Sequence, residues 1–91
     1  MTIVRIANRH VDRETYEALV AELDLDHQHP LGLIVHGASE IDGVMHVAQI
    51  WDSEVYARRY EEERLKPALK AVGAPLDMEV SVFEINHLVT P

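Results

Sequence analysis

Apolar residues form two dense runs at the centre of the chain, at 31–41 and 44–52, and an Asp-Gly pair separates them. An Asp-Gly pair between apolar runs favours a type I′ turn, because both central residues of that turn need a positive φ. The pattern therefore predicts a β-hairpin. Its expected register pairs Ile41 with Val44, Ser39 with His46, His36 with Gln49 and Ile34 with Trp51.

The two faces of this hairpin differ in character. Side chains alternate between faces with a period of two, and both faces are mainly apolar, so both are expected to be covered. Helices of the same chain can cover one face, and a second copy of the chain is the expected cover of the other. The expected dimer face is aliphatic and comprises Leu33, Val35, Gly37, Val44, Ala48 and Ile50. The opposite face comprises Ile34, His36, Ala38, Met45, Val47, Gln49 and Trp51.

The N-terminal third predicts a strand and a helix. Residues 3–8 are apolar apart from Arg5 and Asn8, which indicates a first strand. Asp12 is a typical N-cap, and the helix it begins is expected over 13–24. Residues 24–30 then form an acidic loop that contains two histidines.

The C-terminal half predicts a helix and a final strand. Ser53 is the expected N-cap of the second helix, and Pro67 predicts a kink or a fresh helical turn, because proline lacks an N–H. Gly73 should end this helix. A last strand is expected over 78–89. The order βαββαβ predicts an α+β, ferredoxin-like domain spanning 1–91, with a four-stranded antiparallel sheet and helices on one face only.

Composition narrows the function. The chain has 91 residues and no cysteine, which predicts one small domain without disulfides or thiol chemistry. Sixteen acidic residues against eight basic ones give a net charge of −8, which argues against nucleic-acid and anionic membrane partners. The first ten residues are typical of a strand and not of a signal peptide. We therefore expect a cytoplasmic protein, and the second apolar sheet face adds the expectation of a homodimer.

Four stretches resemble the dimeric α+β barrel superfamily: GLIVHGASEIDG, VMHVAQIWDS, YEEERLKPAL and VFEINHL. In particular the chain is similar, over nearly all its length, to small proteins grouped with the antibiotic-biosynthesis monooxygenases. The resemblance implies a barrel made from the sheets of two protomers, and a pocket between the helices and the sheet of each. It implies that Gln49 and Trp51 face this pocket and that Tyr60 matches a pocket tyrosine of the cyclase branch. The helix histidine of the cyclase and haem-degrading branches has no match here, which weighs against cyclase activity, and haem binding is not expected.

A stripe on the second predicted helix supplies the first candidates. Tyr56, Tyr60 and Arg64 are spaced by four residues and so share one side of the helix. If the tyrosines face the sheet, Arg64 points inward, with Glu61 as a candidate ion-pair partner. Arg64 would then bind an enolate, phenolate or carboxylate of a substrate. The alternative is that it extends to the surface near Pro67.

The hairpin and the first strand supply the others. His36 is a candidate general base, or a hydrogen-bond partner of a substrate oxygen, because its ordinary pKa suits proton transfer; the alternative is a structural pair with Gln49. Trp51 is a candidate stacking wall or simply core. Arg5 is a second anion-binding candidate or an edge salt bridge. We predict His36 and Arg64 as catalytic, and Gln49, Trp51, Tyr56, Tyr60 and Arg5 as substrate-binding.

The acidic loop is the only candidate metal site. His27 and His29, with Asp24 and Asp26, could hold a metal, but a His-x-His loop beside a proline is usually solvated. No zinc spacing and no glycine-rich phosphate loop is present. We expect no metal and no cofactor.

Two function hypotheses remain. The first is a cofactor-independent monooxygenase acting on a small aromatic or polyketide-like substrate. The second is a non-catalytic dimer that binds a small apolar or aromatic ligand or only assembles; a polyketide-cyclase-like enzyme is a further alternative. Three or more of His36, Gln49, Tyr60 and Arg64 around one cavity would favour the first. A cavity filled by Trp51 and the tyrosines would favour the second.

Overall fold

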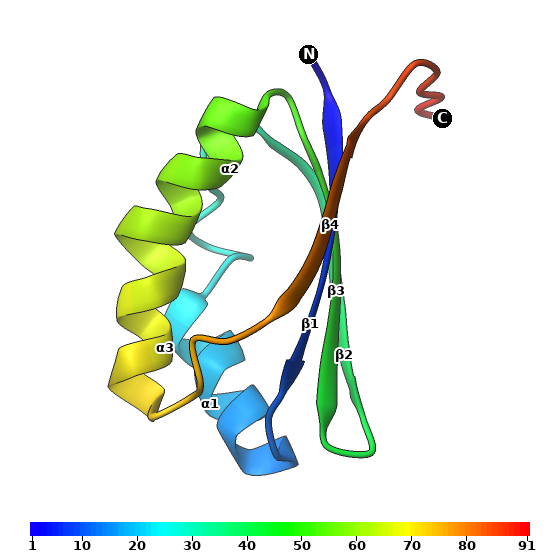
Figure 1. Cartoon of the computed structure of the whole chain (residues 1–91). Helices are drawn as coiled ribbons and strands as arrows, with labels where there is room; N and C mark the ends of the chain where they lie inside the picture. Colours follow the sequence, from blue (N-terminus) through cyan, green and yellow to red (C-terminus); the bar gives the residue numbers. More distant parts are fainter.

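The computed structural model describes residues 1–91 and has the predicted βαββαβ order. The four strands form one antiparallel sheet in the order β2-β3-β1-β4. In Figure 1 all helices lie on one side of the sheet and its other face is bare. This confirms the α+β, ferredoxin-like fold. The elements are β1 (Ile3–His10), α1 (Arg13–Leu23), β2 (Leu33–Ile41), β3 (Val44–Trp51), α2 (Glu54–Tyr60), the π-helical segment η1 (Glu61–Leu65), α3 (Lys66–Val72) and β4 (Glu79–Glu84).

The β2–β3 hairpin has the predicted turn. Asp42 and Gly43 both adopt positive φ, 52° and 81°. The predicted register holds from the turn through the pair of His36 and Gln49 and as far as Val35 opposite Ile50. Beyond this pair a β-bulge intervenes. We had predicted Trp51 opposite Ile34, but it lies opposite Leu33.

The bulge reverses two predicted side-chain directions. Leu33 was assigned to the bare face, but it is only 8% exposed and belongs to the core cluster together with Trp51. Ile34 was assigned to the helix-covered face, and it is 38% exposed. One extra residue on β2 shifts the alternation, and burial of Leu33 against the core accounts for the direction of the shift.

The first and last strands of the chain differ from the prediction in length. β1 continues two residues beyond Asn8, because it pairs with β3 as far as His10 opposite Val44. β4 ends at Glu84, which lies opposite the first residue of β1, so no strand remains for residues after it to pair with. The predicted strand over 78–89 was therefore too long. In Figure 1 the red C-terminal segment leaves the sheet.

Capping explains where the helices begin and end. The Asp12 carboxylate accepts a 2.7 Å hydrogen bond from the Thr15 N–H at the start of α1, as predicted. Ser53 occupies the N-cap of α2, but its side chain makes no capping hydrogen bond. Gly73, with φ 73°, ends α3 in the left-handed conformation.

Pro67 is accommodated without breaking the long helix. Immediately before it, η1 widens the helix, and the Lys66 N–H reaches back to the Glu61 carbonyl, five residues earlier. Proline cannot donate to the carbonyl four residues back and clashes with it, so a local π turn resolves the conflict. A new helical segment, α3, does begin beside Pro67, and the chain from α2 to α3 continues as one helix in Figure 1.

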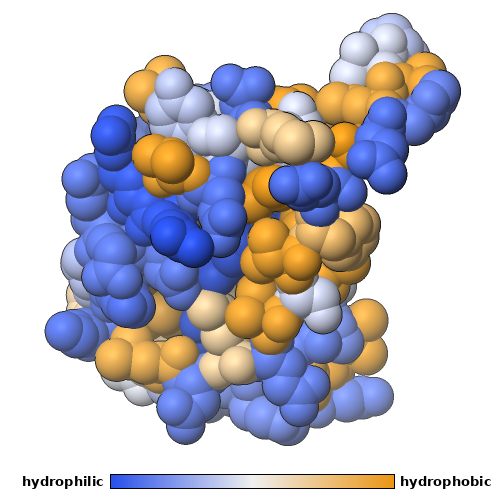
Figure 2. Space-filling model, turned by 45° about the horizontal axis from the view of Figure 1, so that its top comes forward, coloured by the Kyte–Doolittle hydropathy of each residue, from blue (hydrophilic) through white to orange (hydrophobic).

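The core lies between the helices and the sheet, and the opposite face of the sheet stays open. Trp51, Leu19 and Leu69 are the largest fully buried side chains. Figure 2 shows apolar side chains gathered on the sheet side of the molecule, to the right, and mainly hydrophilic ones over the helices. The strand registers place an apolar set on the bare face: Val4, Ile6, Val35, Ala48, Ile50 and Phe83. None of the helices is long and apolar enough to cross a membrane.

Candidate ligand-binding site

A cavity of about 270 Å³ lies between α1 and the helix-covered face of the sheet. Its floor is made of rows of side chains that lie side by side on β1, β3 and β2. The first row is Arg5, Gln49 and His36, the second is Ala7, Val47 and Ala38, and the third begins with Arg9 and Met45. The walls include Tyr16, Leu19, Val20, Leu23, Tyr60 and Leu65.

The hollow exists because two of the three side chains in the middle row are small. Ala7 and Ala38 each end at a methyl group, so these side chains are too short to fill the space between the sheet and the helices. The flanking rows are two residues away on either side of the middle row along β1, so the backbone positions of Arg5 and Arg9 are roughly 13 Å apart. Both guanidinium groups nevertheless extend toward the sulfur of Met78, which brings their charges together on the β1 side of the cavity.

A hydrogen-bonded chain fixes the polar end at His36. The Trp51 Nε1–H donates to Gln49 Oε1 at 3.0 Å, and Gln49 Nε2 lies 3.0 Å from His36 Nδ1. The indole N–H can only donate, so it determines which end of the amide faces the histidine. Gln49 therefore donates to Nδ1, and the neutral ring carries its proton on Nε2.

The surroundings favour this neutral form of His36. Burial lowers the pKa of His36 below its ordinary value, although the charge of Asp26 acts in the opposite direction. Protonation at Nδ1 would also set an N–H against the amide N–H of Gln49. In this state His36 offers an N–H donor at Nε2, and it can accept a proton only after the Gln49 contact breaks.

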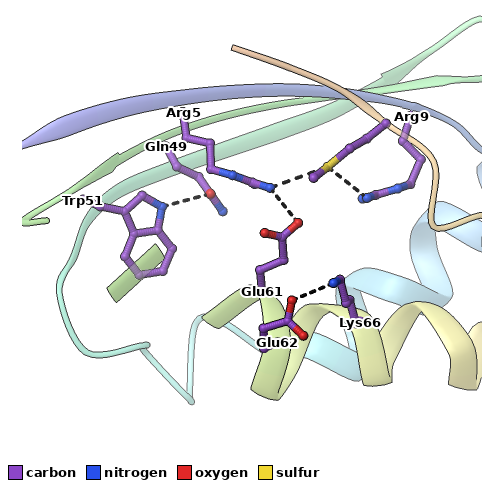
Figure 3. Close-up of polar contacts among 8 residues, drawn as sticks. Arg5, Arg9, Gln49, Trp51, Glu61, Glu62 and Lys66 are labelled. Carbon is purple, nitrogen blue, oxygen red and sulfur yellow. Dashed lines mark hydrogen bonds and ion pairs between the residues drawn. The ribbon is translucent and has the colours of Figure 1, made fainter. Parts of the chain in front are cut away.

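Two buried arginines form the β1 side of the floor. Arg5 is 6% exposed and Arg9 is 4% exposed. Arg5 Nη2 pairs with Glu61 Oε1 at 3.2 Å, and both arginines contact the sulfur of Met78, at 3.5 Å from Arg5 and 3.2 Å from Arg9 (Figure 3). Burial, together with the neighbouring Arg5 charge, lowers the pKa of Arg9.

Tyr60 closes the cavity from the long helix. Its ring lies 5.3 Å from that of Trp51, centroid to centroid, and the side chain is buried. Burial raises the pKa of Tyr60 to about 12, so the phenol stays protonated at neutral pH. Its hydroxyl can therefore donate a hydrogen bond but cannot serve as a base.

The sequence matches no protein-family model and no curated protein, whereas the structure matches solved structures over nearly their whole length. SnoaB, a cofactor-independent oxygenase from Streptomyces nogalater, gives a TM-score of 0.71 at 14% identity, covering 99% of this chain and 98% of that one. A proposed antibiotic biosynthesis monooxygenase from Deinococcus radiodurans gives 0.71 at 13% identity, covering 98% and 97%. Rv0793 from Mycobacterium tuberculosis gives 0.70 at 15% identity, covering 99% and 100%.

This chain has the fold of the antibiotic biosynthesis monooxygenases. The match confirms the resemblance stated from the sequence, and at these identities it concerns the fold alone. Within this monooxygenase-like fold, the activity has to be argued from the cavity and its side chains.

The structure brings together four of the seven predicted site residues. His36, Gln49, Tyr60 and Arg5 line the cavity. Three of the four groups whose convergence was to favour an enzyme therefore surround one space. Trp51 does not line the cavity; it is fully buried in the core beside Tyr60, where its N–H orients Gln49.

Arg64 and Tyr56 lie elsewhere. The Arg64 guanidinium donates to the Leu23 carbonyl at 2.7 Å and to the Gln28 carbonyl, and it lies 5.9 Å above the Tyr60 ring centroid. It ties the end of α1 to the long helix and does not line the cavity, so it does not share a space with His36 as expected. Glu61, its expected partner, pairs with Arg5 instead. Tyr56 packs over Gly32.

Arg9 is the cavity residue that the sequence reading missed. It lies four residues after Arg5 on the same strand, and the period of two puts both on one face. That spacing was the available signal. It was overlooked because the strand was expected to end at Asn8.

The acidic loop makes no metal cluster. His27 Nδ1 lies 2.7 Å from the Asp24 carboxylate, and His29 Nε2 lies 2.9 Å from the Leu33 carbonyl oxygen. No group of three potential metal-binding side chains is placed to hold an ion. These histidines organise the loop that leads into β2.

Proposed function

We propose that the protein is a small-molecule-binding homodimer that acts as a cofactor-independent monooxygenase on a small aromatic or polyketide-like substrate. The observation that carries the proposal is the convergence of His36, Gln49, Tyr60 and Arg5 on one mainly apolar cavity. A volume of about 270 Å³ suits a molecule of one to three fused rings, since pockets for drug-sized ligands begin at about 300 Å³.

The proposed chemistry uses the substrate as the only electron donor. A phenol or enol that binds as its anion, having released its proton to solvent, adds O₂ at a ring carbon. The peroxide anion takes up a proton from solvent, and the resulting hydroperoxide loses water to leave a quinone carbonyl. Substrate and O₂ thus give quinone and water without an external reductant. The chain's part is to hold the flat ring in the apolar middle of the cavity, to stabilise its oxyanion near the arginines, and to donate hydrogen bonds from His36 Nε2 and the Tyr60 hydroxyl.

The homodimer is part of the proposal. The bare sheet face leaves Ile6, Val35 and Phe83 between 42% and 52% exposed in one continuous apolar set. A second copy packed there would cover this face and leave the cavity on the helix side accessible. We also propose a cytoplasmic location and no metal or haem. Stoichiometric metal in elemental analysis of the untagged protein would contradict the last point.

A non-catalytic ligand-binding dimer is the second candidate. Two observations favour it: Nδ1 of His36 already accepts from Gln49, and the Tyr60 phenol stays protonated, so neither is a ready base. In that case the same cavity would bind a ligand without turnover.

Oxygen consumption separates the two candidates. Anthrone and a set of naphthols would be incubated with chelator-treated protein, and ¹⁸O from ¹⁸O₂ would be followed into the product. The Ala38→Leu variant, which fills the cavity, should abolish uptake, while Val55→Ala on the exposed side of α2 should not change it. If some of these compounds bind but none of them supports oxygen uptake, the second candidate is favoured.

A further inference from the structure

The charges on the cavity floor do not balance. Two arginines, Arg5 and Arg9, are more than nine-tenths buried beside one carboxylate, that of Glu61. Glu61 makes its ion pair with Arg5, and Arg9 makes none. The other acidic residue in the row of Arg9 is Glu40, and it is bonded to Arg13 and to the Gly43 N–H. One positive charge therefore remains without a carboxylate partner.

Arg9 is also poorly satisfied as a hydrogen-bond donor. Its Nε is buried without any partner, the one such side-chain atom in the chain. Its only hydrogen bond runs from Nη2 to the thioether of Met78, which is a weak acceptor. Leaving a buried charged donor unpaired is costly, so such a group in a native fold calls for an explanation.

The position of Arg9 supplies one. It lines the cavity from the row of Met45, and the row of Ala7 and Ala38 separates this row from that of His36. The acidic side chains that line the cavity, Asp24 and Asp26, come from the segment after α1, and Asp24 is already paired with His27. No carboxylate that lines the cavity pairs with Arg9, so a negative group of a ligand is favoured beside its guanidinium.

We propose that the cavity binds a flat organic oxyanion whose charged oxygens pair with the Arg9 guanidinium while its rings lie over Ala7 and Ala38. Arg9 is then a specificity-determining residue that selects anionic over neutral ligands. The inference deepens the proposed function, because it names the charge class of the ligand for the same cavity, and it holds whether or not the ligand is turned over. A planar guanidinium suits a carboxylate or the delocalised oxygens of an enolate or phenolate.

Matched probes test the charge preference. The binding of 2-naphthoate and of its neutral isostere 2-naphthamide would be measured by calorimetry on the full-length protein, and 4-nitrophenolate would represent the phenolate source. Wild-type protein should bind the naphthoate about ten- to a hundredfold more tightly than the amide. A preference for the phenolate over the carboxylate would assign the oxyanion to an enol or phenol.

The Arg9→Met variant should lose this preference and bind both naphthalenes equally. Arg58→Met, which removes an exposed arginine outside the cavity, should keep it. The melting temperature of the ligand-free protein separates this role from a purely structural one, because removal of a structural arginine would not raise it. Replacement of an unpaired buried charge by an apolar side chain should raise the melting temperature of Arg9→Met by about 4 °C or more.

Two outcomes would overturn the inference. One is equal binding, or no binding, of both naphthalenes by wild-type protein. The other is a destabilised Arg9→Met protein that still prefers the anion. Failure of the proposed monooxygenase activity is distinguishable from both, because it would show as anion-selective binding without oxygen uptake. Oxygen uptake on neutral compounds with no charge preference would instead leave the activity standing and remove the role of Arg9.

Discussion

At the scale of single residues, the orientation of one indole decides the chemistry of His36. The Trp51 N–H fixes the amide of Gln49, and the amide in turn fixes the tautomer of the histidine. The consequence is that His36 presents a donor to the cavity. A histidine at the same position but without the hydrogen bonds from Trp51 to Gln49 and from Gln49 to the ring could take the other tautomer and offer a nitrogen lone pair to the cavity.

The same residue predicts a pH dependence of stability. The unfolded His36 titrates near its ordinary value of about 6.5, and burial lowers its pKa in the folded state. As the pH falls below about 6.5, the unfolded chain takes up a proton that the folded chain does not, so the free energy of unfolding decreases. His36→Gln should therefore lose less stability than wild type between about pH 7 and pH 5, measured by urea denaturation at constant ionic strength.

His27 provides a comparison of opposite sign. The Asp24 carboxylate raises the pKa of His27, so its contribution is present at low pH and is lost as the pH rises through the folded value. His27→Gln should accordingly remove stability at low pH and not restore it. Identical pH profiles for wild type and His36→Gln would show that His36 titrates alike in both states.

At the scale of elements, local turn chemistry was readable from the sequence and tertiary choices were not. The Asp-Gly pair defined the hairpin because positive φ at two adjacent residues is a local requirement. The bulge between Leu33 and Val35 was not predictable, because it depends on Leu33 joining the core beside Trp51. The site followed the same division: the register gave His36 beside Gln49, but the hydrogen bonds from Arg64 to the carbonyls of Leu23 and Gln28 depend on how the long helix packs against α1 and the loop after it.

The junction between the loop and α2 carries an element-scale prediction. Gly32 has φ +85°, and a Cβ there would lie 2.4 Å from Cγ of Tyr56. Gly73 has φ +73° and nothing within 4 Å of such a Cβ. Gly73→Ala should cost about 1–2 kcal/mol of unfolding free energy from the backbone conformation alone. Gly32→Ala should cost clearly more, because it also displaces Tyr56.

A double-mutant cycle isolates the contact. In the Tyr56→Ala background the excess cost of Gly32→Ala over Gly73→Ala should disappear. Equal costs of the two alanine substitutions in the wild-type background would mean that the tyrosine moves aside freely. Denaturant unfolding of wild type, the three single variants and the two double variants supplies all the required values.

At the scale of the whole molecule, the two faces of the sheet have different roles. The face toward the helices holds the cavity and the arginines, and the other holds an apolar set that no element of the chain covers. The interface predicted from the hairpin alone included Leu33, which the bulge turns into the core. The strand registers add Val4, Ile6 and Phe83 to it.

The last prediction tests that division. Val35 is 51% exposed and lies in one row with Ile50 and Val4 across the bare face. If a second copy packs there, Val35→Asp buries an unpaired carboxylate in the interface, at a cost of about 3–5 kcal/mol, or more than about a hundredfold in the dimer dissociation constant. Val55→Asp is the matched control, because Val55 is 64% exposed on α2, away from the sheet. Sedimentation at micromolar concentration should give a dimer mass for wild type and Val55→Asp and a monomer mass for Val35→Asp. A monomeric wild-type protein would remove the dimer from the proposal and leave the cavity argument intact, since the cavity lies on the helix side of the sheet, away from the bare face.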